Sequence, residues 1–330
     1  MADGRDGERA ARLADDVRME EILEPGLVIC DPHHHLWDRP DNRYMMDELR
    51  ADTGSGHHIE HTVFIDCRSG YRAGGPEAFR PVGETEFVAA ADPDGFIAGI
   101  VSRVDLRLPE ASDVLAAHVE AGGGRFRGIR QSSVWEPSLP ARLGTSNPPP
   151  GLLGDPAFRS GFAALGRAGL SFDAWLYHPQ IHELADLVRA VPETTVILNH
   201  LGGPLGQGAY AGRRDEVRAD WRAAMADLAT CPGVLLKLGG IGMPLFGLDF
   251  HEHPEATTSE DLAAAWGPDI RWCIEQFGVD RCMFESNFPV DGASCSYAVL
   301  WNAFKRMVAD ASPAEKAALF HDTAVRGYRL

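Results

Sequence analysis

Three consecutive histidines follow a short apolar run near the start of the chain. The sequence reads DPHHH from Asp31 to His35, directly after the apolar residues 27–30. If residues 27–31 form a buried strand, alternation of the side chains places His33 and His35 on one side and His34 on the other. Imidazole is a common metal ligand, and two imidazoles two residues apart can both coordinate one ion. The spacing therefore predicts part of a metal site at the end of the first strand.

Composition narrows the class of protein. The chain has 330 residues, of which 45% are hydrophobic, and its formal net charge is −17. This length and apolar content can fill one large core, whereas the negative charge argues against binding to nucleic acid or to an anionic membrane and is explained by solubility. No apolar run reaches the roughly 18 residues of a membrane span, and residues 1–24 lack the apolar segment of a signal peptide. We therefore expect a cytoplasmic protein.

Cysteine usage agrees with that expectation. Six cysteines are spread through the chain without any CxxC spacing, and several of them lie inside apolar runs. Cysteines in this pattern are typical of buried free thiols rather than of disulfides or a zinc knuckle.

Eight short apolar runs recur along the chain, and most are separated by stretches with the 3.6-residue period of amphipathic helices. The runs cover residues 27–30, 62–67, 96–101, 126–131, 171–177, 195–199, 234–238 and 282–286. Alternating strands and helices repeated eight times predict an α/β fold, a (β/α)8 TIM barrel over residues 26–330, with residues 1–25 as an amino-terminal extension. A doubly wound open sheet is the alternative, but it would normally show a glycine-rich turn after its first strand, and residues 31–38 contain no glycine.

Reactive side chains gather just after these predicted strands. In chain order they are His33, His35, Asp66, Arg103, Asp105, Arg130, Gln131, His178, His200, Lys237, Glu285, Asn287 and Asp291. The carboxyl ends of barrel strands meet at one face, where the loops of such barrels carry the active site. We therefore expect His33, His35, His178 and His200 to converge there as metal ligands.

Two long loops are expected to cover this face. They span residues 133–156 and 239–268, and each carries aromatic side chains that could wall an apolar pocket, among them Trp135, Phe246 and Phe250. The second loop also repeats the HxH spacing at His251 and His253. Because that pair lies in a polar stretch, we expect it to contact solvent or to form part of a lid.

Three motifs resemble those of the amidohydrolase superfamily. They are DPHHHLWD over residues 31–38, VILNHLGGP over residues 196–204 and RCMFESNFP over residues 281–289. The closest branch comprises predicted metal-dependent hydrolases of the TIM-barrel fold, including sugar-lactone and pyrone-dicarboxylate lactonases. The resemblance covers about residues 27–330. It implies one or two divalent ions (Zn, Mn or Fe), with His33, His35, His178 and His200 matching the family's histidines.

The sequence departs from the family pattern at two places. Many members carry a carbamylated lysine on strand four, where this chain has Arg130 and Gln131. The aspartate that serves the hydrolases as general base on strand eight aligns with Asn287, and an amide cannot take a proton from water at neutral pH. The base must then be another carboxylate, with Glu285, Asp291 and Asp66 as the candidates, or be absent.

Three activities agree with these features. The first is hydrolysis of a lactone or amide in an acidic small molecule by metal-bound water. For that reaction we expect Arg72, Arg103, Arg130, Gln131 and Asn287 to bind the substrate.

The second activity is a nonheme diiron monooxygenase that hydroxylates an apolar, terpenoid-like intermediate. A diterpenoid-hydroxylating diiron offshoot resembles this fold, and such a site would hold two Fe ions. The third is nonoxidative decarboxylation. A noncatalytic barrel is a further alternative to these activities. The chain could also form a homodimer.

Overall fold

Eight parallel strands form the barrel in the computed structural model, which describes residues 20–40, 42–139 and 148–330. The strands are hydrogen-bonded in the order β1-β4-β5-β6-β7-β8-β9-β10. Their bounds are β1 (Val28–His34), β4 (His58–Ile65), β5 (Ile97–Ser102), β6 (Phe126–Arg130), β7 (Ser171–Ala174), β8 (Val196–Leu198), β9 (Val234–Leu238) and β10 (Cys282–Phe284). Each predicted run contains or overlaps one of these strands, and the predicted TIM barrel is confirmed.

The residues just beyond β10 complete the ring. His34 forms a parallel bridge with Phe288. On either side of this bridge, Asn287 N donates to His33 O at 2.8 Å and His35 N donates to Phe288 O at 2.8 Å. These bonds hold the ends of the first and last strands together, so the side chains that follow them share one neighbourhood.

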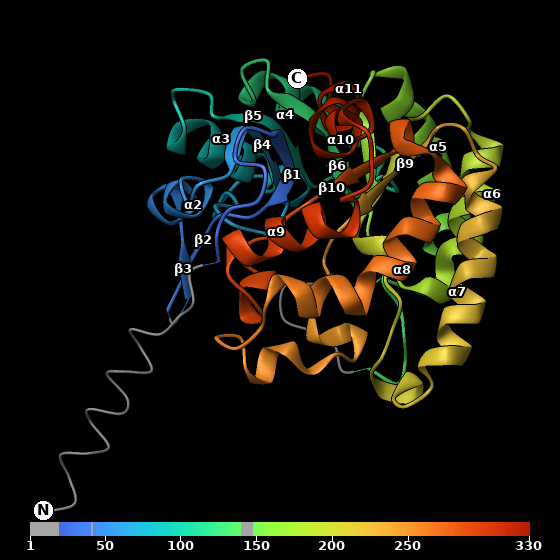
Figure 1. The fold of residues 1–330 in the computed structure, drawn as a ribbon. Helices are drawn as coiled ribbons and strands as arrows, with labels where there is room; N and C mark the ends of the chain where they lie inside the picture. Colours follow the sequence, from blue (N-terminus) through green and yellow to red (C-terminus); the bar gives the residue numbers. More distant parts are fainter. Residues whose placement is uncertain (1–19, 41, 140–147) are drawn as a thin grey trace, which may run out of the picture.

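Helices surround the sheet, as Figure 1 shows. They are α2 (Met46–Thr53), α3 (Val82–Ala91), α4 (Ala111–Ala121), α5 (Pro156–Arg167), α6 (Ile181–Ala190), α7 (Arg214–Ala229), α8 (Ser259–Phe277), α9 (Tyr297–Met307), α10 (Pro313–Ala317) and α11 (Thr323–Tyr328). Helix α8 begins earlier than the predicted loop 239–268 allows, because Thr258 caps it through Asp261 N, and Pro268 is accommodated inside it. In the described part of the chain, no helix has the length and apolarity needed to cross a membrane.

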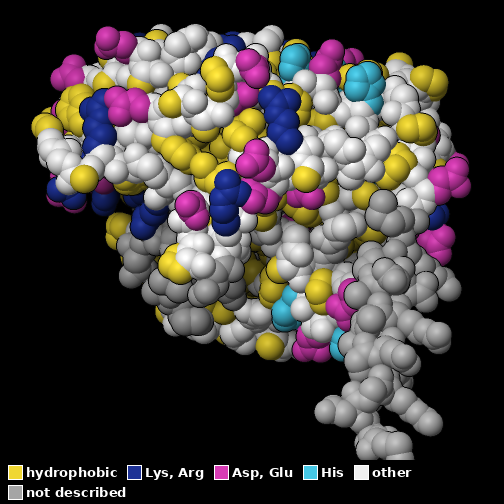
Figure 2. All heavy atoms as spheres, turned by 90° about the vertical axis from the view of Figure 1, so that its left-hand side faces the viewer, with side chains coloured by type: hydrophobic (Ala, Val, Ile, Leu, Met, Phe, Trp, Pro, Cys, Tyr) yellow, Lys and Arg dark blue, Asp and Glu magenta, His cyan; other side chains and the backbone are white. Residues whose placement is uncertain are grey.

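One feature close to β1 and β4 was not predicted. A short antiparallel pair, β2 (Trp37–Arg39) and β3 (Asn42–Tyr44), projects beside α2. On this side of the molecule, Figure 2 shows acidic and basic side chains interspersed with apolar ones. Strands of three residues leave too little alternation to detect from sequence.

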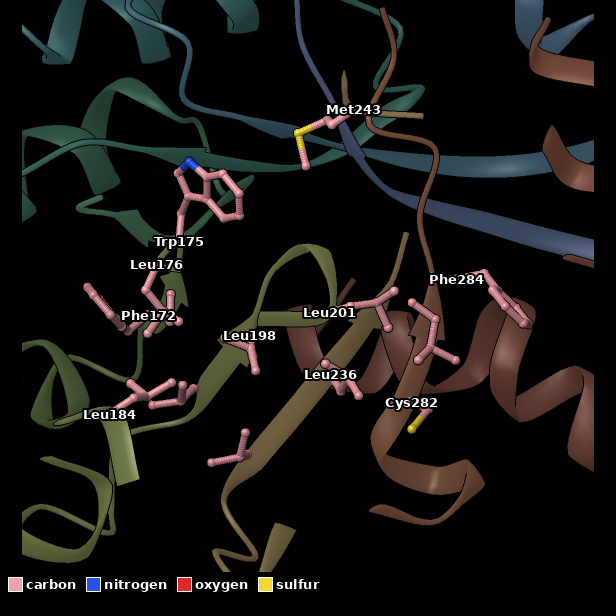
Figure 3. Close-up of a cluster of buried hydrophobic side chains, with 14 of the residues drawn as sticks. Phe172, Trp175, Leu176, Leu184, Leu198, Leu201, Leu236, Met243, Cys282 and Phe284 are labelled. Carbon is pink, nitrogen blue, oxygen red and sulfur yellow. The ribbon is translucent and has the colours of Figure 1, made fainter. Parts of the chain in front are cut away.

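The core lies in two places. A large cluster fills the space between the strands and the helices, and Figure 3 shows part of it, with Leu198, Leu236 and Cys282 on three neighbouring strands. A smaller cluster inside the barrel contains Tyr328 from the carboxyl-terminal helix α11. All six cysteines are free and buried, as predicted.

The described part of the predicted amino-terminal extension packs on α9. Lys305 Nζ donates to Leu23 O at 2.6 Å and Glu24 O at 3.0 Å, and Asn302 Nδ2 donates to Glu21 O at 2.9 Å. Residues 1–19 of the extension lie outside the described residues.

Candidate metal centre at the carboxyl end of the barrel

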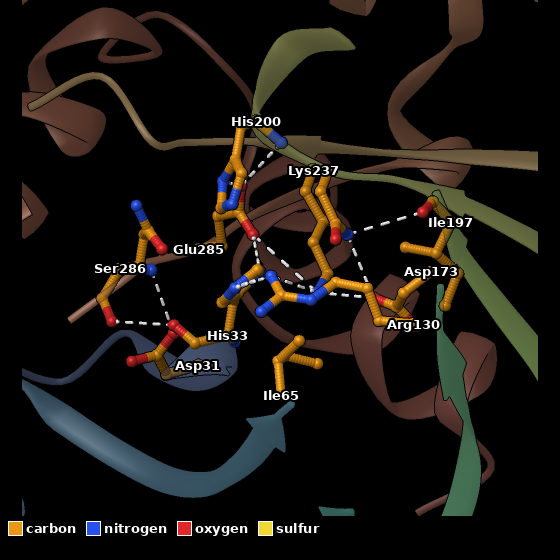
Figure 4. A network of polar contacts seen from close by, with 12 residues as sticks. Asp31, His33, Ile65, Arg130, Asp173, Ile197, His200, Lys237, Glu285 and Ser286 are labelled. Atoms are coloured by element: carbon orange, nitrogen blue, oxygen red, sulfur yellow. Dashed lines mark hydrogen bonds and ion pairs between the residues drawn. The ribbon is translucent and has the colours of Figure 1, made fainter. Parts of the chain in front are cut away.

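Three buried side chains converge where β1, β8 and β10 end. His33 lies in β1, His200 follows β8 and Glu285 follows β10, and one ligand atom of each lies within 4.8 Å of the others. Figure 4 shows the three side chains turned toward one another. Among the residues that the structure describes, no other set of three or more such ligands is this close together. We call His33, His200 and Glu285 the ligand group.

The backbone at one member of the ligand group, His200, is strained. His200 has φ 52° and the next residue, Leu201, has φ 55°, in the left-handed region that non-glycine residues rarely adopt. Glu285 Oε1 accepts hydrogen bonds from His200 N at 3.0 Å and from His200 Nδ1 at 2.7 Å. Strain of this kind persists where surrounding contacts fix the residue, and it often accompanies functional sites.

Two consecutive glycines after β9 make room for these side chains. A methyl group on Gly239 would lie 2.3 Å from Glu285 Cγ, and one on Gly240 would lie 2.8 Å from the His200 ring. Gly240 also has φ 71°. Any larger residue at either position would displace a member of the ligand group.

The protonation states of the ligand group suit the binding of a metal ion. Burial, followed by the charge of Lys237, lowers the pKa of His33 well below its ordinary value. Burial also lowers the pKa of His200, although Glu285 opposes the shift. For Glu285, burial raises the pKa but the pull of His200 and Lys237 outweighs it, so the pKa lies below its ordinary value. The centre thus offers two neutral imidazoles and one ionised carboxylate.

The donor set fits one divalent ion. Glu285 Oε2 lies 2.7 Å from His33 Nδ1, yet it is buried and accepts no hydrogen bond, so its lone pairs are available. Two histidines and one glutamate are the protein ligands of one class of catalytic zinc site, which leaves a position open.

Two cations also reach the ligand group. Arg130 Nη1 lies 3.3 Å from His33 Nε2, and Lys237 Nζ lies 3.2 Å from His33 Nδ1. The sequence places Lys237 among the reactive side chains that follow the strands, but it does not indicate a role for this lysine in the site. A lysine inside the apolar strand VLLKL, residues 234–238, was a signal for a buried charge with a specific partner.

His35 lies beside the ligand group without joining it. Its ring centroid is 5.0 Å from that of His33, and its Nδ1 donates to Ile65 O at 2.8 Å, which leaves Nε2 with the lone pair. The ring stacks on Trp37. As the alternation of side chains along a strand predicts, His34 points away from His33 and His35, and its Nε2 lies 3.0 Å from Thr62 Oγ1 in a hydrogen bond.

His178 also lies outside the ligand group. Its Nδ1 accepts a hydrogen bond from Leu205 N at 3.3 Å, and its ring packs edge-on against Tyr210. Burial lowers the pKa of His178 to about 4. The strand that precedes it, β7, ends at Ala174, so the three residues 175–177 determine where this imidazole points.

Asp291 and Asn287 form a buried pair of their own. Asn287 Nδ2 donates to Asp291 Oδ1 at 2.8 Å, and Gly242 N donates to Asp291 Oδ2 at 2.9 Å. Burial raises the pKa of Asp291 to about 8. Because Asn287 has φ 56°, simple strand alternation from Glu285 no longer describes its direction.

Asp66, after β4, has a carboxyl neighbour. Tyr71 OH donates to Asp66 Oδ1 at 3.1 Å, and burial together with the charge of Asp66 raises the pKa of Glu84 well above its ordinary value. Its surroundings therefore favour the protonated form of Glu84. Arg130 Nη2 hydrogen-bonds to the backbone carbonyl of Asp66, which links this loop to the ligand group.

The other predicted substrate-binding residues have different surroundings. Arg72 pairs with Glu86 at the exposed surface. Gln131 is buried, with Nε2 donating to Asp105 Oδ1 at 3.0 Å and Oε1 accepting from Leu106 N at 2.9 Å. Arg103 is half-buried, and its charge acts on Tyr71.

Comparison with known proteins gives matches along nearly the whole chain. The sequence profile of the family described as Amidohydrolase matches residues 30–330. The uncharacterized protein y4mH of Sinorhizobium fredii is 35% identical over 320 residues, covering 92% of this chain and 99% of that protein. An L-fucono-1,5-lactonase of Burkholderia multivorans is 28% identical over 318 residues, covering 92% of this chain and 97% of the lactonase.

Solved structures share the fold. The crystal structure of an amidohydrolase from Burkholderia multivorans with bound zinc superposes with a TM-score of 0.73 at 24% identity. The match covers 92% of this chain and 99% of that one.

Proposed function

The chain belongs to the amidohydrolase family, and from this premise we propose that it is a metal-dependent hydrolase that opens a lactone of a small acidic molecule. The observation that carries the proposal is the ligand group, in which two neutral imidazoles and one carboxylate meet at the carboxyl end of a parallel barrel. That face is where barrel enzymes place their chemistry.

His33, His200 and Glu285 would hold one divalent ion, for which zinc, manganese and iron all suit the donor set. When bound, the metal supplies an acidified water and polarisation of the substrate carbonyl. Glu285 orients His200 through the bonds from Oε1 to the ring and to the backbone amide. With its carboxylate occupied in this way, Glu285 is a positioning residue and a ligand rather than the general base.

We assign proton transfer to Asp66. Asp291 is buried, and with a pKa of about 8 it is protonated near neutral pH, so it cannot serve as the base there. Asp66 lies next to the ligand group, because its backbone carbonyl bonds to Arg130, and its carboxylate is held by Tyr71 OH at 3.1 Å from Oδ1. We expect Asp66→Asn to lower kcat by a factor of about 10² to 10⁴, the usual contribution of a general base. The metal content of this variant should be unchanged.

We assign substrate anchoring to Arg130. Its guanidinium lies at the edge of the ligand group and is half-buried, where it can pair with a carboxylate or an acyl oxygen of the substrate. Trp175 stands edge-on to His200 at 4.8 Å between centroids and offers an apolar wall. The relatives described as L-fucono-1,5-lactonases favour a sugar-acid lactone over an amide as the substrate.

The test is metal analysis combined with lactone turnover. Protein purified without chelator is analysed for metals, then assayed by acid release on a panel of 1,4- and 1,5-sugar-acid lactones. We expect one divalent ion per chain, with metal and turnover both lost in His33→Ala. His253→Ala is the matched control, because this histidine belongs to the second HxH pair and is 78% exposed.

Other results would contradict the proposal. Turnover unchanged after metal removal would exclude metal-dependent hydrolysis. Two irons per chain with oxygen consumption would instead indicate the diiron oxygenase. No contact in the described residues favours that alternative, since only three ligands of this kind are grouped together.

A further inference from the structure

Lys237 is a completely buried lysine at the centre of the barrel. It belongs to β9 and its side chain has no exposed surface. Its Nζ lies 3.0 Å from Asp173 Oδ1, 3.2 Å from His33 Nδ1 and 3.8 Å from Glu285 Oε2. These neighbours are two carboxylate oxygens and one imidazole nitrogen, which are the atoms that bind a divalent ion in proteins. The amine therefore occupies a position suited to a second metal ion.

Asp173 is fixed from the barrel interior. Its Oδ1 accepts hydrogen bonds from Tyr328 OH at 2.7 Å and from Asn199 Nδ2 at 3.0 Å, in addition to Lys237. Asp173 itself is completely buried. A buried carboxylate is costly without a charge partner, and Lys237 supplies one. Figure 4 shows Asp173 and Lys237 side by side with the ligand group.

Two carboxylates flank the amine. Asp173 Oδ1 and Glu285 Oε2 both lie within 4 Å of Nζ. The same two carboxylates would repel the negative charge of a carbamate, so this lysine is not a substitute for a carbamylated metal ligand.

We propose that the Lys237 side chain takes the place of a second metal ion, positions His33 and Glu285, and restricts the centre to a single divalent ion. The proposal rests on the metal site of the proposed function, but not on the reaction assigned to it. A second divalent ion would have to displace the buried amine and would place two metal ions a few ångströms apart at low dielectric.

The test measures metal stoichiometry. Purified apo protein is saturated with Zn²⁺, desalted and analysed by inductively coupled plasma mass spectrometry, and the Kd for Zn²⁺ is measured by competition with a chromophoric chelator. We expect one ion per chain in the wild-type protein. Lys237→Ala empties the position and leaves Asp173, His33 and Glu285 to bind, so we expect close to two ions.

A second variant fills the position instead of emptying it. Lys237→Met combined with Asp173→Asn removes both charges of the pair, which avoids leaving a buried carboxylate unpaired. We expect this variant to bind one ion at least tenfold more tightly than the wild-type protein, because the amine that contacts His33 and Glu285, and competes with the ion for them, is gone. It also keeps the proposal testable if Lys237→Ala does not fold.

Lys305→Met is the matched control. Lys305 is also a buried lysine, 1% exposed, but its contacts are the amino-terminal segment and His57. We expect this variant to keep one ion and the wild-type Kd.

Two results would overturn the inference: two ions in the wild-type protein, or no rise in stoichiometry or affinity in the folded Lys237 variants. Lactone hydrolysis with two ions per chain would refute the role of Lys237 and support the lactone reaction of the proposed function. One ion per chain without hydrolysis of any lactone would support the role of Lys237 and refute the proposed function.

Discussion

We expect Gly239→Ala to disrupt the ligand group, although Gly239 is not one of its members. The added methyl would lie 2.3 Å from Glu285 Cγ and 2.4 Å from Glu285 O, so Glu285 must move by about 1 Å to reach ordinary contact. Overpacking of this kind costs about 1–3 kcal/mol. The displaced carboxylate also weakens its two bonds to His200, each worth about 1.5–3 kcal/mol for a charged acceptor. Since relaxation recovers part of both, we expect a loss of about 4 kcal/mol in the metal-free protein.

Differential scanning calorimetry and zinc titration measure the two consequences. For a chain of this length a loss of 4 kcal/mol corresponds to a decrease in Tm of about 6 °C. Zinc affinity should fall at least tenfold. Gly233→Ala is the control, because Gly233 directly precedes β9 and its methyl would meet only Pro192 O, at 3.5 Å. Equal Tm and equal zinc affinity in the two variants would refute the view that Gly239 exists to accommodate Glu285.

Three further outcomes are expected. Tyr328→Phe removes one of the donors to Asp173 and should lower the free energy of unfolding by about 1–2 kcal/mol in urea titrations, and an unchanged midpoint would argue against that bond. Asp291 has a raised pKa of about 8, so the folded state retains a proton that the unfolded state releases, and its contribution to stability is lost as pH rises from about 4 through 8. Asp291→Asn should therefore flatten the decline in urea midpoint between pH 6 and 8, and an equally steep decline would contradict this. His178→Ala should keep its metal while His200→Ala loses it, as measured by elemental analysis, and metal loss in both would place His178 in the centre.

The barrel was predictable because its signals are local. Each strand is a short apolar run and most helices have amphipathic periodicity, so the runs at residues 234–238 and 126–131 match β9 and β6 almost residue for residue. The hairpin of β2 and β3 was missed because its strands are three residues long and are defined by pairing with each other. Membership of the amidohydrolase family also followed from the sequence, since its motifs are contiguous.

The sequence by itself determined the fold, the family and the presence of His33, His200 and Glu285 at strand ends. Only the tertiary structure decided which strand-end residues meet. Strand alternation predicts the direction of a side chain but not its depth, and it does not apply after a strand ends, as at His178 and Asn287. The role of Lys237 was hidden for the same reason. Its partners lie 204 and 64 residues away in the chain, at His33 and Asp173, and only closure of the barrel brings them within hydrogen-bonding distance.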